Sequence, residues 1–352
     1  MSSRKAVCFT LWFSTHNNPR YAELFPQLTS VVQFYRITFH RLRFIRALQY
    51  RLWSLLRKRI YRVVLRRLSR RYETLFTTDP DQICLWPRGN SVVVDADDPV
   101  FSLTEVESFN LPQVRGIIVT TEKAKSIFQQ LGVTRPIHVI PQGILIGQVD
   151  VNKVEQVRSL LKDDQDIVVG YHAPTLTLFC DGPGRARGGQ DDLDLLFESL
   201  ELARNREPRL KLWLLGEASK SVEKYVADGR ESWIKLLGYL PLSEVMAYIM
   251  NFDIGVYPRI WTPPPGRFSV KIAQFMGCGI PTVSTDLDEA FVLKEGKCGI
   301  ICASSEQFSN AIVDLAQSPQ KRADLGKAGQ EYATMNLDWT ILVQRYKQIL
   351  TV

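Results

Sequence analysis

The chain has 352 residues, of which 45% are hydrophobic and 23% are charged, which is enough for two folded domains and excludes general disorder. No apolar run reaches the roughly 18 residues that a membrane-spanning helix requires. The formal charge of +7 is uneven: residues 36–71 contain thirteen Lys or Arg and no acid, whereas the remaining 31 basic and 37 acidic residues give −6. The positive charge therefore indicates a local anionic partner of that one segment.

The first part of the chain predicts an α/β domain with few strands. Apolar runs predict strands over residues 5–13, 92–95, 116–119 and 137–140, and helical spacing predicts a helix over 121–130. The first run is followed by polar residues without a small-residue cleavage site, so a buried strand is favoured over a signal sequence. Six cysteines without a CxxC pair favour reduced thiols in a cytoplasmic protein.

The basic segment predicts an amphipathic helix, as one long helix or two. Apolar residues recur at helical spacing from Ile45 to Leu68, and arginines fill the other face. Three interpretations stay open: the segment lies on an anionic leaflet, packs on the domain core with its arginines in solvent, or binds another protein. Nucleic acid is not the expected partner, because no recognition fold accompanies the charge.

From Ile167 onward, short apolar runs alternate with helical patterns, which predicts a parallel sheet with helices on both faces. Strands are expected over residues 167–172, 210–215, 233–237, 253–257, 280–284 and 298–302. A glycine-rich loop over 180–190 follows the first of them. Helices are expected over 306–317, 320–335 and 339–350.

Residues 253–283 predict an anion site. A strand ends at Pro258, a loop follows, and Ser269 is well placed to cap the next helix. Backbone N–H groups at a helix start favour phosphate, and Arg267 and Lys271 add positive charge there. Lys271 and Gln274 share one helix face, so that the lysine can meet a diphosphate and the glutamine can meet ribose hydroxyls. The alternative is an ordinary strand–loop–helix with two incidental surface cations.

The segment from Ser269 to Val283 resembles the donor-site signature of family 4 glycosyltransferases, Lys-x-x-Glu-Tyr/Phe-Met-Ala-x-Gly-x-Pro-Val-Val. Further landmarks of that family are resembled by residues 212–216, 234–240, 253–258 and 296–300. The resemblance covers residues 167–350 and extends more weakly to 92–143. It implies the GT-B fold, which consists of two Rossmann-like domains with parallel sheets that face each other across a cleft.

The resemblance also implies domain bounds. Residues 1–146 are expected to form an acceptor-side domain that contains the basic helical segment 36–71. Residues 147–336 are expected to bind the nucleotide sugar, and a helix within 337–352 is expected to pack back on the first domain.

The implied activity is transfer of a hexose from a nucleotide diphosphate sugar, with retention of configuration and without a metal or cofactor. The expected acceptor is lipid-linked or a polysaccharide, and the expected location is the cytoplasm, peripheral to the inner face of the plasma membrane. The expected donor-binding residues are Arg267, Ser269, Lys271, Gln274, His172 and Gly216. The family's two glutamates, eight positions apart, are replaced here by Gly266 and Gln274, so a non-catalytic binding or assembly subunit is the alternative.

Acidic residues follow the predicted strand 92–95, in the run Asp95-Ala96-Asp97-Asp98. Such carboxylates can bind Mg²⁺ or Mn²⁺, cap the next segment, or line the cleft, where one can act as a general base. Because the GT-B fold holds a diphosphate with cations and a helix end, no metal site is expected. The candidate catalytic residues are Asp97, Asp98 and, in the loop after the first strand, His16; Arg20 of that loop could touch acceptor or phosphate.

Overall fold

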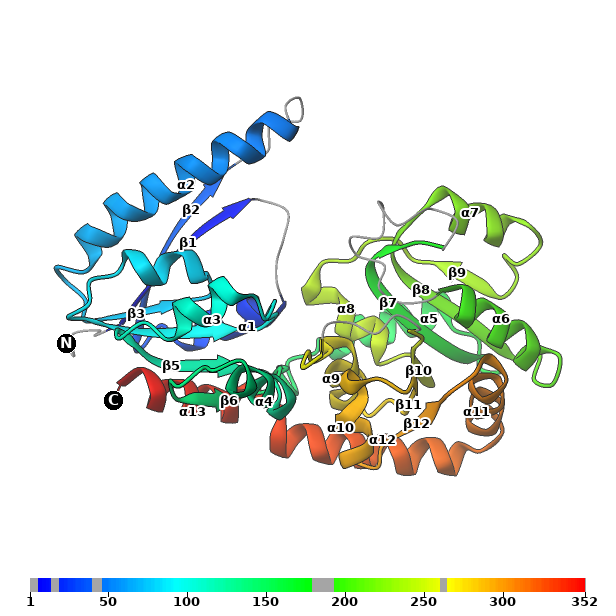
Figure 1. Ribbon diagram of the computed structural model, residues 1–352. Coiled ribbons are helices and arrows are strands. Elements are labelled where there is room, and N and C mark those ends of the chain that lie inside the picture. Colours follow the sequence, from blue (N-terminus) through cyan, green and yellow to red (C-terminus); the bar gives the residue numbers. More distant parts are fainter. Residues whose placement is uncertain (1–5, 14–18, 40–45, 179–192, 260–264, 352) are drawn as a thin grey trace. The chain divides into compact units, whose positions relative to one another are not determined.

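The computed structural model describes residues 6–13, 19–39, 46–178, 193–259 and 265–351. The chain divides into two compact units, each with one six-stranded sheet (Figure 1). Unit 1 comprises Met1–Gln142, Pro264–Phe268 and Trp339–Val352, and unit 2 comprises Gly143–Pro263 and Ser269–Asp338. Unit 1 is therefore assembled from three separate stretches of sequence. No helix in the described ranges is long and apolar enough to cross a bilayer.

The sheet of unit 1 is parallel and has the strand order β2-β1-β3-β4-β5-β6. The strands are β1 (Ala6–Phe13), β2 (Val32–Phe39), β3 (Thr74–Thr77), β4 (Ser91–Ala96), β5 (Val114–Val119) and β6 (Ile137–Val139). The helices are α1 (Pro19–Gln27), α2 (Arg46–Leu68), η1 (Pro80–Leu85, a 3-10 helix), α3 (Leu103–Phe109), α4 (Glu122–Gln130) and α13 (Trp339–Thr351).

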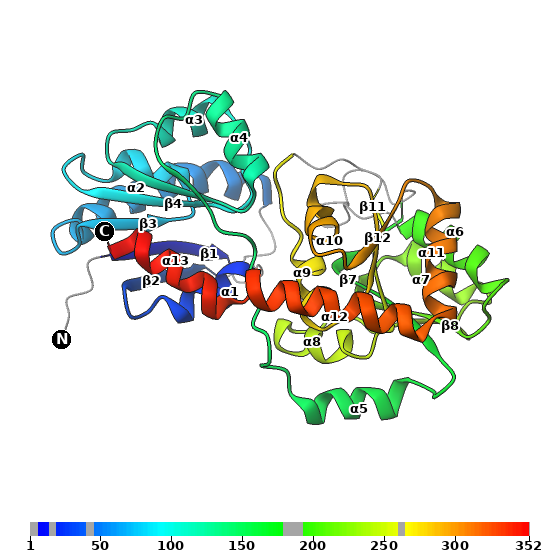
Figure 2. The same ribbon diagram turned by 90° about the horizontal axis from the view of Figure 1, so that it is seen from below.

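Two strands of this sheet, β2 and β3, are not predicted from the sequence. The expected helical segment 36–71 is corrected by this finding, because residues 36–39 belong to β2 and the helix α2 covers only Arg46–Leu68. One face of the sheet packs against α2, η1, α3 and α4, which share a single apolar core with it. On the other face, α1 and α13 lie side by side (Figure 2).

The sheet of unit 2 is also parallel, with the order β12-β11-β10-β7-β8-β9, so both units confirm the predicted α/β class. Its strands are β7 (Ile167–Leu176), β8 (Leu210–Ala218), β9 (Ile234–Leu236), β10 (Ile254–Tyr257), β11 (Thr282–Thr285) and β12 (Gly299–Cys302). Its helices are α5 (Val151–Leu161), α6 (Leu193–Arg204), α7 (Lys220–Ala227), α8 (Leu242–Ile249), α9 (Val270–Gly277), η3 (Asp288–Ala290, a 3-10 helix), α10 (Phe291–Glu295), α11 (Ser305–Gln317) and α12 (Pro319–Asn336).

Strand order in unit 2 reverses between β7 and β10. From β7 the chain continues through β8 to β9 on one side, and from β10 it continues through β11 to β12 on the other. Parallel sheets bind ligands at the carboxyl ends of strands beside such a reversal. Helices α6, α7 and α11 cover one face of this sheet, whereas α5, α8 and α9 cover the opposite face.

Glycine on β10 brings α9 close to the sheet at this reversal. A Cβ atom at Gly255 would lie 2.8 Å from the ring of Phe275 on α9, so only glycine admits that ring. The same holds for Gly170 on β7, where a Cβ atom would lie 2.0 Å from the ring of Phe252. Because Phe275 is fully buried, its packing against the sheet fixes the position of α9 and of the polar residues on this helix.

Candidate functional site

Lys271 lies in the first turn of α9, at the carboxyl edge of the unit 2 sheet. Its Nζ is 3.4 Å from the hydroxyl oxygen of Tyr171 on β7. It is also 5.0 Å from the ring centroid of Tyr171 and 5.6 Å from that of Tyr257, which ends β10. Aromatic faces attract an ammonium group without neutralising it. The two tyrosines therefore hold a positive charge beside β7 and β10, where the order of the sheet reverses.

Gln274 follows one turn later on the same side of α9. Its side chain is only 2% exposed, and among the described residues its Oε1 has no hydrogen-bond partner. A buried amide oxygen without a partner costs about 1–3 kcal/mol, and such groups need an explanation in a folded protein. A ligand that donates a hydrogen bond from a hydroxyl group would satisfy this oxygen.

Ser269 occupies the N-cap position of α9, with φ −89° and ψ 116°. Its side chain makes no capping hydrogen bond, so the predicted capping by this hydroxyl is wrong. Arg267 belongs to unit 1, where its Nε lies 3.5 Å from Oδ1 of Asp98. Of the two cations expected at the start of α9, Lys271 is the one that belongs to unit 2 with the helix.

A buried ion pair lies near Lys271 in the sequence and was not predicted. Nη1 of Arg259, just after β10, is 2.7 Å from Oε2 of Glu289, and both side chains are 4% exposed. The hydroxyl of Tyr257 donates a hydrogen bond to Glu289 and accepts one of 2.9 Å from Arg259. Hydrogen bonding on this scale is what allows a charge pair to be buried. The ion pair with Arg259 explains the position of Glu289 without a ligand. In the sequence, only the arginine near the end of a predicted strand indicates such a pair.

His172 and Gly216 have packing partners of their own. The ring of half-buried His172 meets the ring of Phe275 edge-on, at 5.6 Å between centroids. Gly216 has φ +148°, and a Cβ atom there would lie 2.1 Å from the carbonyl oxygen of Ala173. The glycine is therefore required by the approach of β8 to β7, whether or not a ligand binds beside it.

In unit 1, a buried arginine joins elements that are far apart in the sequence. Arg20, at the start of α1, is 0% exposed. Its Nε and Nη2 each lie 3.3 Å from an oxygen of Asp95, the last residue but one of β4. It also donates to the carbonyl oxygens of Ile140 and Pro141, at 3.2 and 3.0 Å, and to the hydroxyl of Tyr346 on α13. We call Arg20, Asp95 and Tyr346 the Arg20 cluster, in which the guanidinium predicted to touch acceptor or phosphate is buried and hydrogen-bonded within unit 1.

Of the three acids in the run from Asp95 to Asp98, one belongs to the Arg20 cluster and two are more accessible to solvent. Asp95 faces Arg20 and receives a further hydrogen bond of 2.8 Å from Tyr346, and burial raises its pKa against the opposing effect of Arg20. Asp97 is 16% exposed, with Oδ1 at 3.6 Å from Nε of Arg20, and Asp98 is 67% exposed. Asp97 and Asp98 are therefore the acids of the run that solvent reaches. His16 lies outside the described residues.

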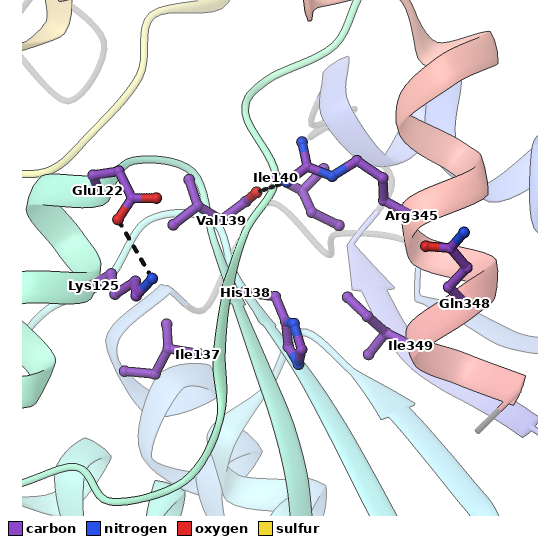
Figure 3. Close-up of a pocket in the computed structure, with 9 residues that line it drawn as sticks. All are labelled: Glu122, Lys125, Ile137, His138, Val139, Ile140, Arg345, Gln348 and Ile349. Carbon is purple, nitrogen blue, oxygen red and sulfur yellow. Dashed lines mark hydrogen bonds and ion pairs between the residues drawn. The ribbon is translucent and has the colours of Figure 1, made fainter.

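Unit 1 also has a hollow of about 320 Å³ between α4, β6 and α13, shown in Figure 3. Nη2 of Arg345 donates a hydrogen bond of 2.5 Å to the carbonyl oxygen of Val139 at its edge, and Lys125 pairs with Glu122 across 3.5 Å. Burial, together with Lys125 and Arg345, lowers the pKa of His138 inside it. None of the site residues predicted from the sequence lines this hollow.

Glu23 adds a pH-dependent contact between α1 and α13, because its Oε2 accepts a 2.9 Å hydrogen bond from Nε1 of Trp339. Burial raises its pKa from 4.5 to about 7, against the effect of that hydrogen bond. The folded chain thus binds more protons than the unfolded chain between about pH 4.5 and 7, and stability falls as pH rises through this window.

We expect Glu23→Gln, which keeps the acceptor oxygen, to be more stable than the unchanged protein above pH 7, by about 1–2 kcal/mol after allowance for partial exposure. Near pH 4.5 the two proteins should match. Urea unfolding at a series of pH values measures the difference, and a difference that does not change with pH would contradict the assignment.

Comparison with known proteins identifies a family model and a curated protein that are similar to part of this chain. Residues 182–318 match the family model described as Glycosyl transferases group 1. The GDP-mannose-dependent monoacylated alpha-(1-6)-phosphatidylinositol monomannoside mannosyltransferase of Corynebacterium glutamicum is 22% identical over 188 residues. That alignment covers 52% of this chain and 49% of the relative, so the match spans about half the length of the curated protein.

Two solved structures cover nearly the whole chain. HepE of Anabaena, in complex with UDP and glucose, has a TM-score of 0.71 at 18% identity over 99% of both chains. WaaG, a glycosyltransferase involved in lipopolysaccharide biosynthesis, has a TM-score of 0.65 at 14% identity over 98% of this chain and 99% of its own. At these identities the likeness shows a common fold built on two parallel sheets.

Proposed function

We propose, on the premise that this chain belongs to the group 1 glycosyltransferases and has their GT-B fold, that it transfers a sugar from a nucleotide diphosphate sugar to an acceptor. The observation that carries the proposal is the pair formed by Lys271 and Gln274 on α9. A positive charge and a buried acceptor oxygen, one turn apart at the carboxyl edge of a parallel sheet, suit a diphosphate and a sugar hydroxyl.

The proposed role of Lys271 is electrostatic. Transfer breaks the bond between the donor sugar and the diphosphate, so negative charge grows on the departing oxygen. A cation and the start of a helix, held in place before the reaction, stabilise that charge more than mobile water does. We propose that Gln274 accepts a hydrogen bond from the ribose. We further propose that transfer retains configuration, that the donated sugar is a hexose, and that no metal is needed, because Lys271 and α9 supply the positive charge.

Unit 1 is the proposed acceptor side. Half-buried Asp97 and exposed Asp98 follow β4, and one of them can orient or deprotonate an acceptor hydroxyl. The mannosyltransferase is named for a phosphatidylinositol monomannoside and WaaG for lipopolysaccharide biosynthesis, which supports a lipid-linked or polysaccharide acceptor for this chain. We propose that it acts in the cytoplasm, as a peripheral protein at the inner face of the plasma membrane.

The test is release of nucleoside diphosphate by the purified protein. Nucleotide sugars with uracil, guanine and adenine bases would be supplied, with and without a membrane lipid extract as acceptor. We expect one donor to be consumed faster when the extract is present. Tight binding of a nucleotide sugar without turnover across all acceptors would instead support a non-catalytic binding or assembly subunit.

A further inference from the structure

The outward side of α2 combines basic and aliphatic side chains. Lys58 pairs with Asp81 on the inward side, so we define the α2 outer face by the other exposed residues, which are Leu56, Arg59, Arg62, Val63, Arg66 and Arg67. Leu56 is 49% exposed and Val63 is 58% exposed, so two aliphatic side chains lie among the arginines of this face. The sequence of α2 contains no acidic residue. Positive charge and apolar side chains are therefore presented together along this helix.

The inward side of α2 explains why this face points outward. Tyr61 and Leu65 are buried in the core of unit 1. The hydroxyl of Tyr61 donates a 2.7 Å hydrogen bond to Asp79, and Arg57 forms ion pairs with Asp79 and Asp81 of the η1 region. These contacts fix the rotation of the helix about its own axis.

The spacing of the outer residues follows from that rotation. At 100° per residue, Arg59, Val63 and Arg66 fall opposite Tyr61. Leu56 and Val63 are seven positions apart, which places them on one side with two turns between them. Packing on the domain core thus accounts for the inner side of α2. The α2 outer face stays exposed and is available for contact with another surface.

We propose that the α2 outer face docks unit 1 on a bilayer that contains anionic lipids. The four arginines of this face attract anionic headgroups cumulatively, and Leu56 and Val63 can enter the boundary between headgroups and acyl chains. Nucleic acid fits this face less well, because aliphatic side chains between arginines gain nothing from a phosphate backbone. The inference rests on the proposed function, because a lipid-linked acceptor lies in the membrane that this face would contact. Binding of the protein to vesicles is nevertheless measurable without sugar transfer.

The first experiment compares binding to vesicles of neutral lipid with binding to vesicles that contain 30% anionic lipid. The triple variant Arg59→Gln, Arg62→Gln, Arg66→Gln removes three charges from the α2 outer face. The matched control Lys220→Gln, Lys224→Gln, Lys327→Gln removes three charges from exposed positions of unit 2. We expect binding to require anionic lipid, to weaken at least 30-fold in the first variant, and to stay within threefold in the control.

A second experiment reports the depth of the aliphatic residues. Val63→Trp places a tryptophan on the α2 outer face, and Leu202→Trp places one at a 45% exposed position of unit 2. Brominated anionic lipids should quench the emission added by the first variant and leave that added by the second unchanged. Equal quenching of the two would overturn the assignment of this face.

Further outcomes separate the alternatives. Equal recovery on neutral and anionic vesicles, or equal loss in the two triple variants, would overturn the proposal. So would binding to a DNA duplex that exceeds binding to anionic vesicles at the same ionic strength. The first triple variant should retain the thermal midpoint and the nucleotide affinity of the unchanged protein. A loss of vesicle binding with nucleotide binding intact separates failure at this surface from failure of the proposed reaction.

Discussion

Replacement of Arg20 by Ala is expected to destabilise the protein by about 3–5 kcal/mol, a large part of the stability of an ordinary domain. The guanidinium is fully buried and meets both oxygens of Asp95 at 3.3 Å. Its removal leaves that carboxylate buried without its cation and frees the carbonyl oxygens of Ile140 and Pro141. Desolvation of a carboxylate is costly unless a partner remains, and the hydroxyl of Tyr346 alone is a weak replacement.

Urea unfolding, followed by far-ultraviolet circular dichroism, measures this loss. Arg345→Ala is a suitable control, because it removes an exposed arginine from α13 with a single backbone hydrogen bond. The control should lose less than about 1 kcal/mol. The double variant Arg20→Met, Asp95→Leu should be more stable than Arg20→Ala, since it removes the charge that would be stranded. A loss below about 1 kcal/mol in Arg20→Ala would show that the Arg20 cluster contributes little.

Replacement of Lys271 by Ala is expected to weaken binding of a nucleoside diphosphate roughly 100-fold, which corresponds to about 2.7 kcal/mol. The ammonium is held beside β7 and β10 by Tyr171 and Tyr257, so its position does not have to be acquired when the ligand arrives. Lys271→Met tests the charge separately, because its unbranched side chain can still pack on both rings. We expect the two variants to bind equally weakly.

Titration calorimetry with UDP and GDP measures these affinities. Lys294→Ala is the matched control, since Lys294 also belongs to unit 2 but pairs with Asp286 across 2.6 Å at an exposed position. Its affinity should stay within about threefold of the unchanged protein. If Lys271→Ala binds as tightly as this control does, the diphosphate is not held at the start of α9.

The sheet of unit 2 is predicted well from the sequence because its strands lie inside the molecule. Strands buried on both faces give continuous apolar runs, as at Ile254–Tyr257, and glycines mark their ends. The edge strand β2 escapes prediction because one side of an edge strand is open. It tolerates Gln33, Arg36 and Thr38, which break the apolar pattern and lead into the basic segment. The strand β3 begins and ends with threonine, which leaves only Leu75 and Phe76 as an apolar run.

The candidate site is predicted only where residues are neighbours in the sequence. Lys271 and Gln274 share a helix face by spacing alone, and the structure keeps them on α9. The Arg20 cluster could not be found in this way, because Asp95 and Tyr346 are 75 and 326 positions away from Arg20. Arg267 is close to Lys271 in the sequence, yet a segment of a few residues around it joins unit 1. No local pattern reports such a crossing between units.

The three-part make-up of unit 1 also has a consequence for the order in which the protein is made. The Arg20 cluster and the contact of Glu23 need Tyr346 and Trp339, which are translated after all of unit 2. At about 5–20 residues per second, residues 143–338 take tens of seconds to emerge from the ribosome. During that time the nascent first unit lacks α13, and Arg20 and Asp95 lack the hydroxyl of Tyr346. The unit that begins first is therefore completed last, and chaperones have their longest access to the sheet face where α13 will lie.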